Sequence, residues 1–442
     1  MSSKKILIDG YNLNLEAGTG VATYARNLSY RIHALGYDVD VVYGTRAAPR
    51  EKLLREIAFF DSNVGRPNKY AAAWDYLQHA IRSPLYELAR AVPITGNVIT
   101  TTYASRLPYF DRLWNIPTLF DRSVRHFGLL KRLTNIDVPS RPDLVHWTYP
   151  LPIRARGAKN IYTIHDLVPL RLPYTTLDVK RRYYRIAKKL AARADHIVTV
   201  SEHSRRDIIN LLNVPEDRVT NTYQSVEIPQ KFAGKPDDVV KREVEGTLNV
   251  KYKGYFLFFG AIEPKKNVSR MIEAYLSSGV ETPLLLVGKA AWKSDEELRM
   301  LNADVTRYLE TIDRMTITRH RIQRIDYVPF SVLVSIIRGA KAVLFPSLYE
   351  GFGLPALEAM LLGTPVITST ESSMPEVVGD GALMVDPYDS RALAEAIRTV
   401  DSNDELRGEL SAKGVKQAAK FSPEAYDRRL KSLYDRVIGS GA

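Results

Sequence analysis

The sequence contains no cysteine among its 442 residues. That absence excludes a disulfide framework and any metal site built on thiolates. No uninterrupted apolar run approaches the ~20 residues that a membrane-spanning helix needs. The chain passes from Met1 directly into Ile6-Leu-Ile-Asp9, without the longer apolar stretch and cleavage site of a signal peptide. We therefore expect a cytoplasmic protein, attached at most to the inner face of the cytoplasmic membrane.

Acidic residues are fewer than basic ones, 50 against 62, which gives a formal net charge of +12. This excess predicts anionic partners, which include phosphates, phospholipid head groups and nucleic acid, without choosing among them. The length exceeds one ordinary core and favours two α/β domains of roughly 200 residues each.

Short apolar runs alternate with helical patterns along the chain. Strands are predicted at 5–9, 38–43 and 196–200, with a helix at 21–35 that Gly36 ends. Strands separated by helices indicate doubly wound parallel sheets. A basic helix is expected from about 177 to 193.

A second α/β series begins at 255. Residues 230–250 are polar and lack apolar periodicity, so they predict an interdomain linker. The expected division is an acceptor-side domain at 1–235, a donor domain at 250–420, and a helix at 421–442 that crosses back to the first domain or packs in the second.

Residues 66–134 interrupt the alternation. They hold ten basic and four acidic residues, a net charge of +6, with ten aromatic residues interleaved. One interpretation is an inserted helical segment with solvated charges and an aromatic core. The other is a surface that meets an anionic lipid-linked acceptor or a bilayer.

The most informative stretch is Glu350-Gly-Phe-Gly-Leu-Pro355 with Glu358 after it. A predicted strand ends near Phe345, and Pro355 is expected at the first position of a helix. Glycines let the backbone approach a ligand, and a helix N-terminus offers unpaired N–H groups to a phosphate. Alone, Glu350 would fit a helix cap and Glu358 a surface charge. The glycines between them favour a site for a nucleotide sugar.

This stretch resembles the signature of the family-4 retaining glycosyltransferases. Gly260-Ala-Ile-Glu-Pro-Lys-Lys-Asn267 is similar to the family's diphosphate loop, and Gly18-Thr-Gly20 and Tyr162-Thr-Ile-His165-Asp166 also match. The resemblance implies the α/β fold called GT-B: two doubly wound Rossmann-like domains facing across a cleft, here with a helical insertion in the N-terminal domain.

The resemblance also implies roles for the matching positions. Glu350 would contact the donor sugar and Glu358 the ribose, while Lys266 would neutralise the diphosphate and His165 would lie near the acceptor. By themselves, His165 and Asp166 also fit a hydrogen-bonded turn. The implied catalytic set is Glu350, His165 and Lys266. The implied donor-binding set is Gly20, Lys265, Lys266, Glu350, Gly351, Phe352, Gly353, Leu354 and Glu358.

One position departs from the family pattern. Many members carry an arginine where this sequence has Ala261, and Lys265 is expected to supply the missing charge, although it cannot make the bidentate fork of arginine. The family usually works without a divalent metal or other cofactor. We interpret Asp38-Val-Asp40 as strand residues, because the pair lies inside an apparent strand.

The resemblance to bacterial mannosyl- and deoxyhexosyltransferases of polysaccharide or lipopolysaccharide assembly favours a GDP-linked donor over a UDP-linked one. The acceptor is expected to be a glycan or a lipid-linked glycan, and residues 66–134 suggest an anionic membrane surface as a further partner. No nucleic acid is expected. Two alternatives stay open at this point. One is a nucleotide-sugar epimerase or sugar phosphorylase on the same fold. The other is a basic nucleic-acid- or membrane-binding protein, for which salt-dependent DNA binding would be expected.

Overall fold

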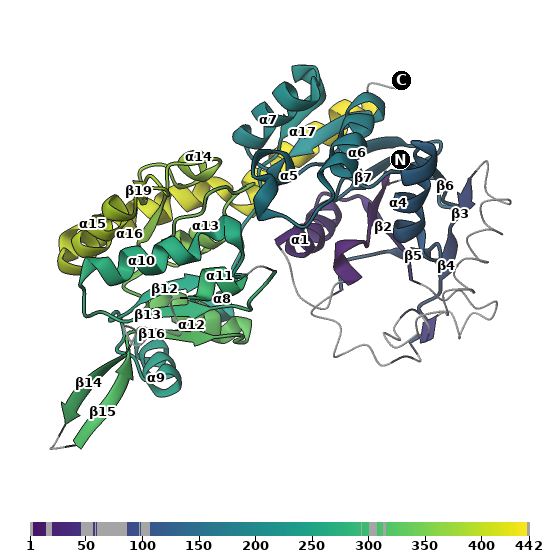
Figure 1. The fold of residues 1–442 in the computed structure, drawn as a ribbon. Helices are drawn as coiled ribbons and strands as arrows, with labels where there is room; N and C mark the ends of the chain where they lie inside the picture. Colours follow the sequence, from purple (N-terminus) through teal and green to yellow (C-terminus); the bar gives the residue numbers. More distant parts are fainter. Residues whose placement is uncertain are drawn as a thin grey trace.

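The computed structural model describes residues 3–14, 20–45, 56–57, 59, 86–96, 98, 107–292, 294–299, 307–312 and 315–439. The chain forms two α/β halves, each built around its own sheet (Figure 1). The strands of the first sheet all lie before residue 222, and those of the second lie between 256 and 385. Gly18, part of the resemblance, lies outside the described residues.

The N-terminal half is built on an eight-stranded sheet whose neighbours are parallel except at one edge, where β4 and β5 run antiparallel. The central strands carry side chains that are fully buried, as in Ile6, Leu7 and Ile8 of β1, so both faces of the sheet are covered. In spatial order the strands are β11 (Val219–Asn221), β10 (His196–Thr199), β9 (Lys159–Thr163), β7 (Leu144–Trp147), β1 (Lys5–Asp9), β2 (Asp38–Tyr43), β5 (Arg112–Asn115) and β4 (Arg90–Val92). A smaller sheet holds β3 (Glu87–Leu88), β6 (Thr134–Asp137) and β8 (Ile153–Ala155).

Two helix ends of this half lie where local signals predict them. Gly36 adopts a φ of +84° just after the helix α1, and the Ser201 side chain accepts a hydrogen bond from Ser204 N at the start of α7. The helices are α1 (Gly20–Ala34), α4 (Leu119–Leu130), α5 (Val168–Arg171), α6 (Lys180–Arg193) and α7 (Glu202–Leu212).

The C-terminal half has a six-stranded, wholly parallel sheet. Its order is β16 (Ile322–Ile325), β13 (Leu284–Val287), β12 (Phe256–Phe259), β17 (Ala342–Phe345), β18 (Val366–Ser369) and β19 (Leu383–Val385). Its helices are α8 (Gln230–Ala233), α9 (Asp237–Leu248), α10 (Val268–Ser278), α11 (Ser294–Leu298), α12 (Phe330–Gly339), α13 (Leu354–Leu361), α14 (Met374–Val378), α15 (Ser390–Ser402) and α16 (Asp404–Ala418). The hairpin of β14 (Arg307–Ile312) and β15 (Met315–His320) projects from this half (Figure 1).

The prediction of a linker over 230–250 is wrong. Most of this segment is helical, and α9 packs against α12. Val240, Val244 and Leu248 are buried at a spacing of four residues, which places them on one face of the helix. Three buried apolar residues among many charged ones were enough to hold this amphipathic helix against the core.

A helical insertion was predicted at 66–134. Within the part of this range that the structure describes, α4 is the only helix. Residues 66–85 lie outside the described residues, and 87–115 contributes β3, β4 and β5. β5 extends the main sheet beside β2, where Arg112 pairs with Asp38 and Asp40, both at 2.9 Å. One of the charges that suggested a separate surface thus joins β5 to β2 within the sheet.

The last helix, α17 (Pro423–Gly439), contacts the N-terminal half. The hydroxyl of Tyr434 lies 2.7 Å from Nδ1 of buried His146, and Arg31 Nε donates to Asp427 at 2.8 Å. His146 also lies 2.8 Å from the Thr163 hydroxyl, so its contacts are structural. The helix therefore ties the end of the chain to the first sheet.

Candidate functional site

The candidate site lies where loops at the carboxyl ends of strands from both sheets meet. These are the loops after β9, β12 and β17, joined by the N-terminus of α1. In doubly wound folds this edge is where ligands bind, because parallel strands direct their following loops to one side. A Cβ built on Gly20 of α1 would lie 4.0 Å from Leu354 Cδ1, which shows how closely the halves approach there.

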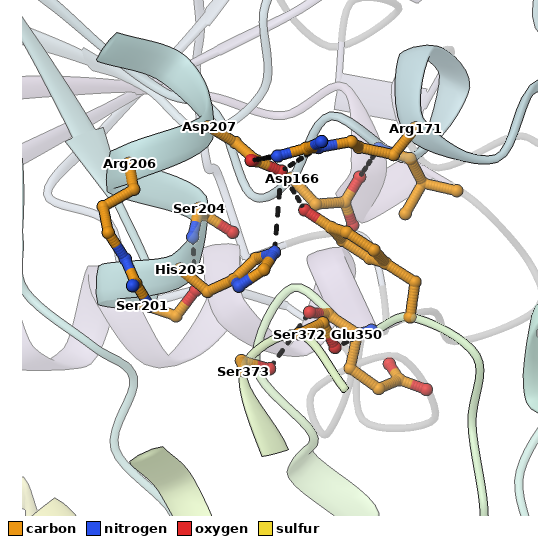
Figure 2. A network of polar contacts seen from close by, with 12 residues as sticks. Asp166, Arg171, Ser201, His203, Ser204, Arg206, Asp207, Glu350, Ser372 and Ser373 are labelled. Carbon is orange, nitrogen blue, oxygen red and sulfur yellow. Dashed lines mark hydrogen bonds and ion pairs between the residues drawn. The ribbon is translucent and has the colours of Figure 1, made fainter. Parts of the chain in front are cut away.

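The loop after β17 is held in shape by two serines (Figure 2). The hydroxyl of Ser373 donates to the carbonyls of Glu350 at 3.0 Å and Phe352 at 2.9 Å. The backbone N–H of Glu350 donates to Ser372 Oγ at 2.8 Å. These bonds fix the loop before any ligand binds.

Both glycines of this loop are required by their surroundings. A Cβ on Gly351 would lie 2.9 Å from the His165 carbonyl oxygen and 3.1 Å from Asp166 Oδ2, both in the other half. Gly353 has a φ of +104°, and its Cβ would lie 2.7 Å from Met374 Sδ. The first glycine permits the halves to touch, and the second permits the turn into α13.

The backbone N–H groups of residues 351–354 form a candidate anion site. Within the described ranges, none of these four amides has a hydrogen-bond acceptor. They lie at the N-terminus of α13, where unpaired N–H groups favour negative charge. Pro355 occupies the second position of this helix, not the first as predicted. The ring of Phe352 points elsewhere and packs on Tyr223 and Phe421.

Glu350 forms a buried ion pair with Lys266. Lys266 Nζ lies 2.5 Å from Glu350 Oε1 and 4.6 Å from the centre of the Phe345 ring. Burial alone would raise the pKa of Glu350, but the charges of Lys266 and Lys265 outweigh it and lower the pKa. Glu350 is therefore ionised at neutral pH and offers its second oxygen as an acceptor.

Lys265 brings a second cation to the cleft. Lys265 and Lys266 end the short turn η4 (Pro264–Lys266) after β12. Lys265 Nζ lies 3.5 Å from Glu263 Oε1. Burial would lower the pKa of Lys265, but the nearby carboxylates of Glu350, Glu263 and Asp166 raise it above its usual value. A permanent positive charge thus lies near the family's arginine position, where the side chain of Ala261 is exposed.

His165 is fixed as a neutral ring. Its Nε2 lies 3.0 Å from the Thr148 carbonyl, which can only accept, so Nε2 carries the hydrogen and Nδ1 is left as an acceptor. Burial lowers the pKa of His165, although Thr148 and Asp166 oppose the shift. The N–H of Thr148 donates in turn to the buried carboxylate of Asp9. Residues 9, 148 and 165 therefore form one connected unit.

A cavity of about 430 Å³ lies between the halves beside these groups. His165, Asp166 and Tyr183 line it from one half, and Lys265 and Trp292 line it from the other. Of the predicted residues, only His165 and Lys265 line this cavity. Glu350, Lys266 and the 351–354 loop adjoin it through Lys265 and through the contact of Gly351 with His165.

Glu358 lies one turn into α13 and is half-buried. No hydrogen-bond or ion-pair partner reaches its side chain from the described part of the chain. Burial raises the pKa of Glu358 to about 7. A carboxylate that loses its hydration and gains no partner for its charge is typical of a group that binds a ligand.

Sequence reasoning missed the contacts that join the two halves (Figure 2). The Tyr349 hydroxyl donates to Asp207 at 2.6 Å, and Arg171 Nε donates to both oxygens of Asp207 at 3.0 Å. The Glu376 carboxylate accepts from the backbone N–H groups of Glu202 and His203, each at 2.9 Å, and so caps α7 from the other half. Tyr349 precedes the loop of residues 350–354 and Glu376 follows it. Nothing in the spacing of these two residues indicates that their partners lie more than 140 residues away.

Known proteins resemble this chain in sequence. The model of the family described as Glycosyltransferase Family 4 matches residues 18–227, and that described as Glycosyl transferases group 1 matches 241–417. The O-antigen chain mannosyltransferase B of Escherichia coli is 34% identical over 284 residues, which cover 62% of this chain and 69% of that protein. This chain belongs to the family-4 glycosyltransferases.

The serotype-specific mannosyltransferase WbdA of Escherichia coli is 28% identical to this glycosyltransferase over 285 residues, 62% of this chain. The match spans 33% of WbdA, about one third of its length.

Solved structures confirm the predicted GT-B fold. Sucrose-phosphate synthase from Thermosynechococcus elongatus has a TM-score of 0.65 at 17% identity, covering 99% of this chain and 100% of that one. WaaG, a glycosyltransferase involved in lipopolysaccharide biosynthesis, has a TM-score of 0.59 at 15% identity, again covering 99% and 100%. Such identities show the fold alone. In the described part of the glycosyltransferase, no helix is long and apolar enough to cross a membrane.

Proposed function

We propose that this glycosyltransferase moves a hexose or deoxyhexose, with mannose favoured, from a nucleoside diphosphate to a glycan or lipid-linked glycan, with retention of the anomeric configuration. Mannose transfer is supported by the names of its relatives, the mannosyltransferases B and WbdA. GDP is the favoured carrier, because mannosyl donors are usually GDP-linked.

The observation that carries the proposal is the grouping of Lys265, Lys266 and the backbone N–H groups of 351–354 opposite His165. Within the described ranges these four N–H groups have no acceptor. The diphosphate would lie against these amides and Lys265. The sugar would reach Glu350 and the ribose would reach Glu358. Fixed cations and N–H dipoles stabilise the charge that develops on a leaving diphosphate.

In the proposed reaction, the bond from the anomeric carbon to the diphosphate oxygen breaks, and its electron pair leaves with the diphosphate. The acceptor hydroxyl bonds to the anomeric carbon on the same face, and its proton passes to the leaving oxygen. Protein cations would neutralise the diphosphate, which is why we propose transfer without a metal ion. The Asp38 and Asp40 carboxylates are paired with Arg112, and no cluster of acidic or histidine ligands is found within the described ranges.

The test is thermal unfolding with GDP, UDP, ADP and their hexose derivatives. A ligand at 100 times its dissociation constant should add about 2.7 kcal/mol to the free energy of unfolding. We expect the largest stabilisation with GDP or GDP-mannose, and its loss in Lys265→Ala and Glu358→Ala. The matched control is Lys416→Ala, which removes an exposed lysine of α16. Stabilisation by none of these nucleotides would contradict the proposal.

A further inference from the structure

The outward face of α6 is strongly basic. Its 14 residues, KRRYYRIAKKLAAR, include seven Lys or Arg and no Asp or Glu. Ile186, Ala187, Leu190 and Ala191 are buried and hold the helix against the protein. The basic side chains that are exposed on the opposite side belong to Arg181, Arg182, Arg185, Lys188 and Arg193.

These five charges have no carboxylate partner within the part of the chain that the structure describes. Other helices neutralise their exposed cations locally: Arg242 pairs with Asp238 at 2.8 Å, Lys413 with Glu409 at 2.6 Å and Lys431 with Asp435 at 2.9 Å. Two acids flank α6 in sequence, Asp178 before it and Asp195 after it. The face of α6 is thus an unbalanced positive surface.

Exposed apolar side chains adjoin this face. Leu177 is 69% exposed and Val179 is 55% exposed, and Val179 immediately precedes the first turn of α6. Both line the cavity that His165 also lines, and so does Arg182. The basic face, the apolar rim and the mouth of the cavity are therefore one continuous region, on the N-terminal half beside α5 and α7 (Figure 1).

We propose that α6 and residues 177–179 dock this glycosyltransferase onto an anionic lipid bilayer. Lys and Arg side chains whose charge no carboxylate balances are attracted to anionic head groups, and neighbouring apolar side chains are stabilised by entering the interface. The docked orientation brings the mouth of the cavity to the lipid surface. Resting on the proposed function, this arrangement would present a lipid-linked acceptor directly to His165.

The test is co-sedimentation of the full chain with sucrose-loaded vesicles, without donor or acceptor. We expect binding to vesicles of phosphatidylcholine with 30% phosphatidylglycerol and little binding to phosphatidylcholine alone. Raising NaCl from 50 to 300 mM should weaken it, because salt screens exposed charges. The variant Arg181→Glu/Arg185→Glu/Lys188→Glu should bind at least tenfold more weakly. Leu177→Ser/Val179→Ser should bind severalfold more weakly at unchanged net charge.

The matched control is Arg391→Glu/Arg398→Glu/Lys416→Glu, which makes the same charge change at exposed positions of α15 and α16. This control should keep most of the vesicle binding. An equal loss in both triple variants would overturn the proposal, because only net charge would then matter. So would a wild-type protein that binds a 20-base-pair DNA duplex but not anionic vesicles. Vesicle binding, together with no thermal stabilisation by any of the nucleotides, would support docking and contradict only the proposed transfer reaction.

Discussion

At the scale of single residues, two glutamates of the cleft have different surroundings. Glu350 is compensated by Lys266, so burial does not keep it protonated. Glu358 has no such partner among the described residues, and burial raises its pKa to about 7. Two acids eight positions apart therefore differ in charge near neutral pH. The uncompensated one costs stability in the absence of a ligand.

We predict that Glu358→Gln stabilises the unliganded protein. The folded state holds the Glu358 proton up to about pH 7, whereas the unfolded state releases it near 4.5, so the wild type loses stability as pH rises between these values. The variant should gain up to about 3 kcal/mol above pH 7 and almost nothing at pH 4.5. Donor affinity should fall about tenfold, since a hydrogen bond to a charged group is lost.

Urea unfolding at pH 4.5 and pH 8 measures the stability change, and Glu395→Gln, at an exposed position of α15, is the control. A stability gain that is equal at both pH values would contradict the desolvation argument.

At the scale of secondary-structure elements, the sequence predicted what depends on local pattern. The strands β1, β2 and β10, the stop after α1 and the cap of α7 follow from apolar runs, Gly36 and Ser201. The grouping of Lys265, Glu350 and His165 followed only from the family resemblance. The hydrogen bond from Tyr349 to Asp207 joins residues that are 142 positions apart in the sequence, and no local propensity encodes such a contact. The helix α9 was missed because its three buried apolar residues are spread over nine positions of a charged segment.

The cap that Glu376 places on α7 should matter for both stability and turnover. Glu376→Ala leaves two backbone N–H groups at the start of α7 without their acceptor, which should cost about 1 kcal/mol in the free energy of unfolding. It should also raise the KM for the donor, because Glu376 lies on α14, next to the serines that hold the Glu350 loop.

The matched control is Asn403→Ala, which removes the cap of α16 away from the interface. Denaturant unfolding should show a similar cost for both variants, while steady-state kinetics should change only for Glu376→Ala. An unchanged KM in Glu376→Ala would show that the cap is purely structural.

At the scale of the whole molecule, the two halves are in contact around the candidate site. Gly351 lies so close to His165 and Asp166 that a Cβ would collide with them, α7 is capped by Glu376, and α17 returns to the first sheet. The proposed catalytic groups come from both halves, so their geometry depends on how closely the halves approach. A side chain at position 351 would therefore push the two halves apart.

We predict that Gly351→Ala lowers turnover about 100-fold, because misplacement near 1 Å of reacting groups has effects of that size. Small-angle scattering should show a larger radius of gyration with bound nucleotide than the wild type has. Gly408→Ala is the control, since a Cβ there meets nothing within 4 Å. Normal turnover in Gly351→Ala would mean that the contact with His165 is not needed for catalysis.

The most direct test of the central claim is the anomeric configuration of the sugar released by slow donor hydrolysis without acceptor. Proton NMR at early times should show that α-linked GDP-mannose gives α-mannose first. Lys266→Ala should slow this release by about 100-fold or more, because one fixed charge is lost from the leaving diphosphate. Initial formation of β-mannose, or release at the wild-type rate in Lys266→Ala, would contradict retaining transfer at this cleft.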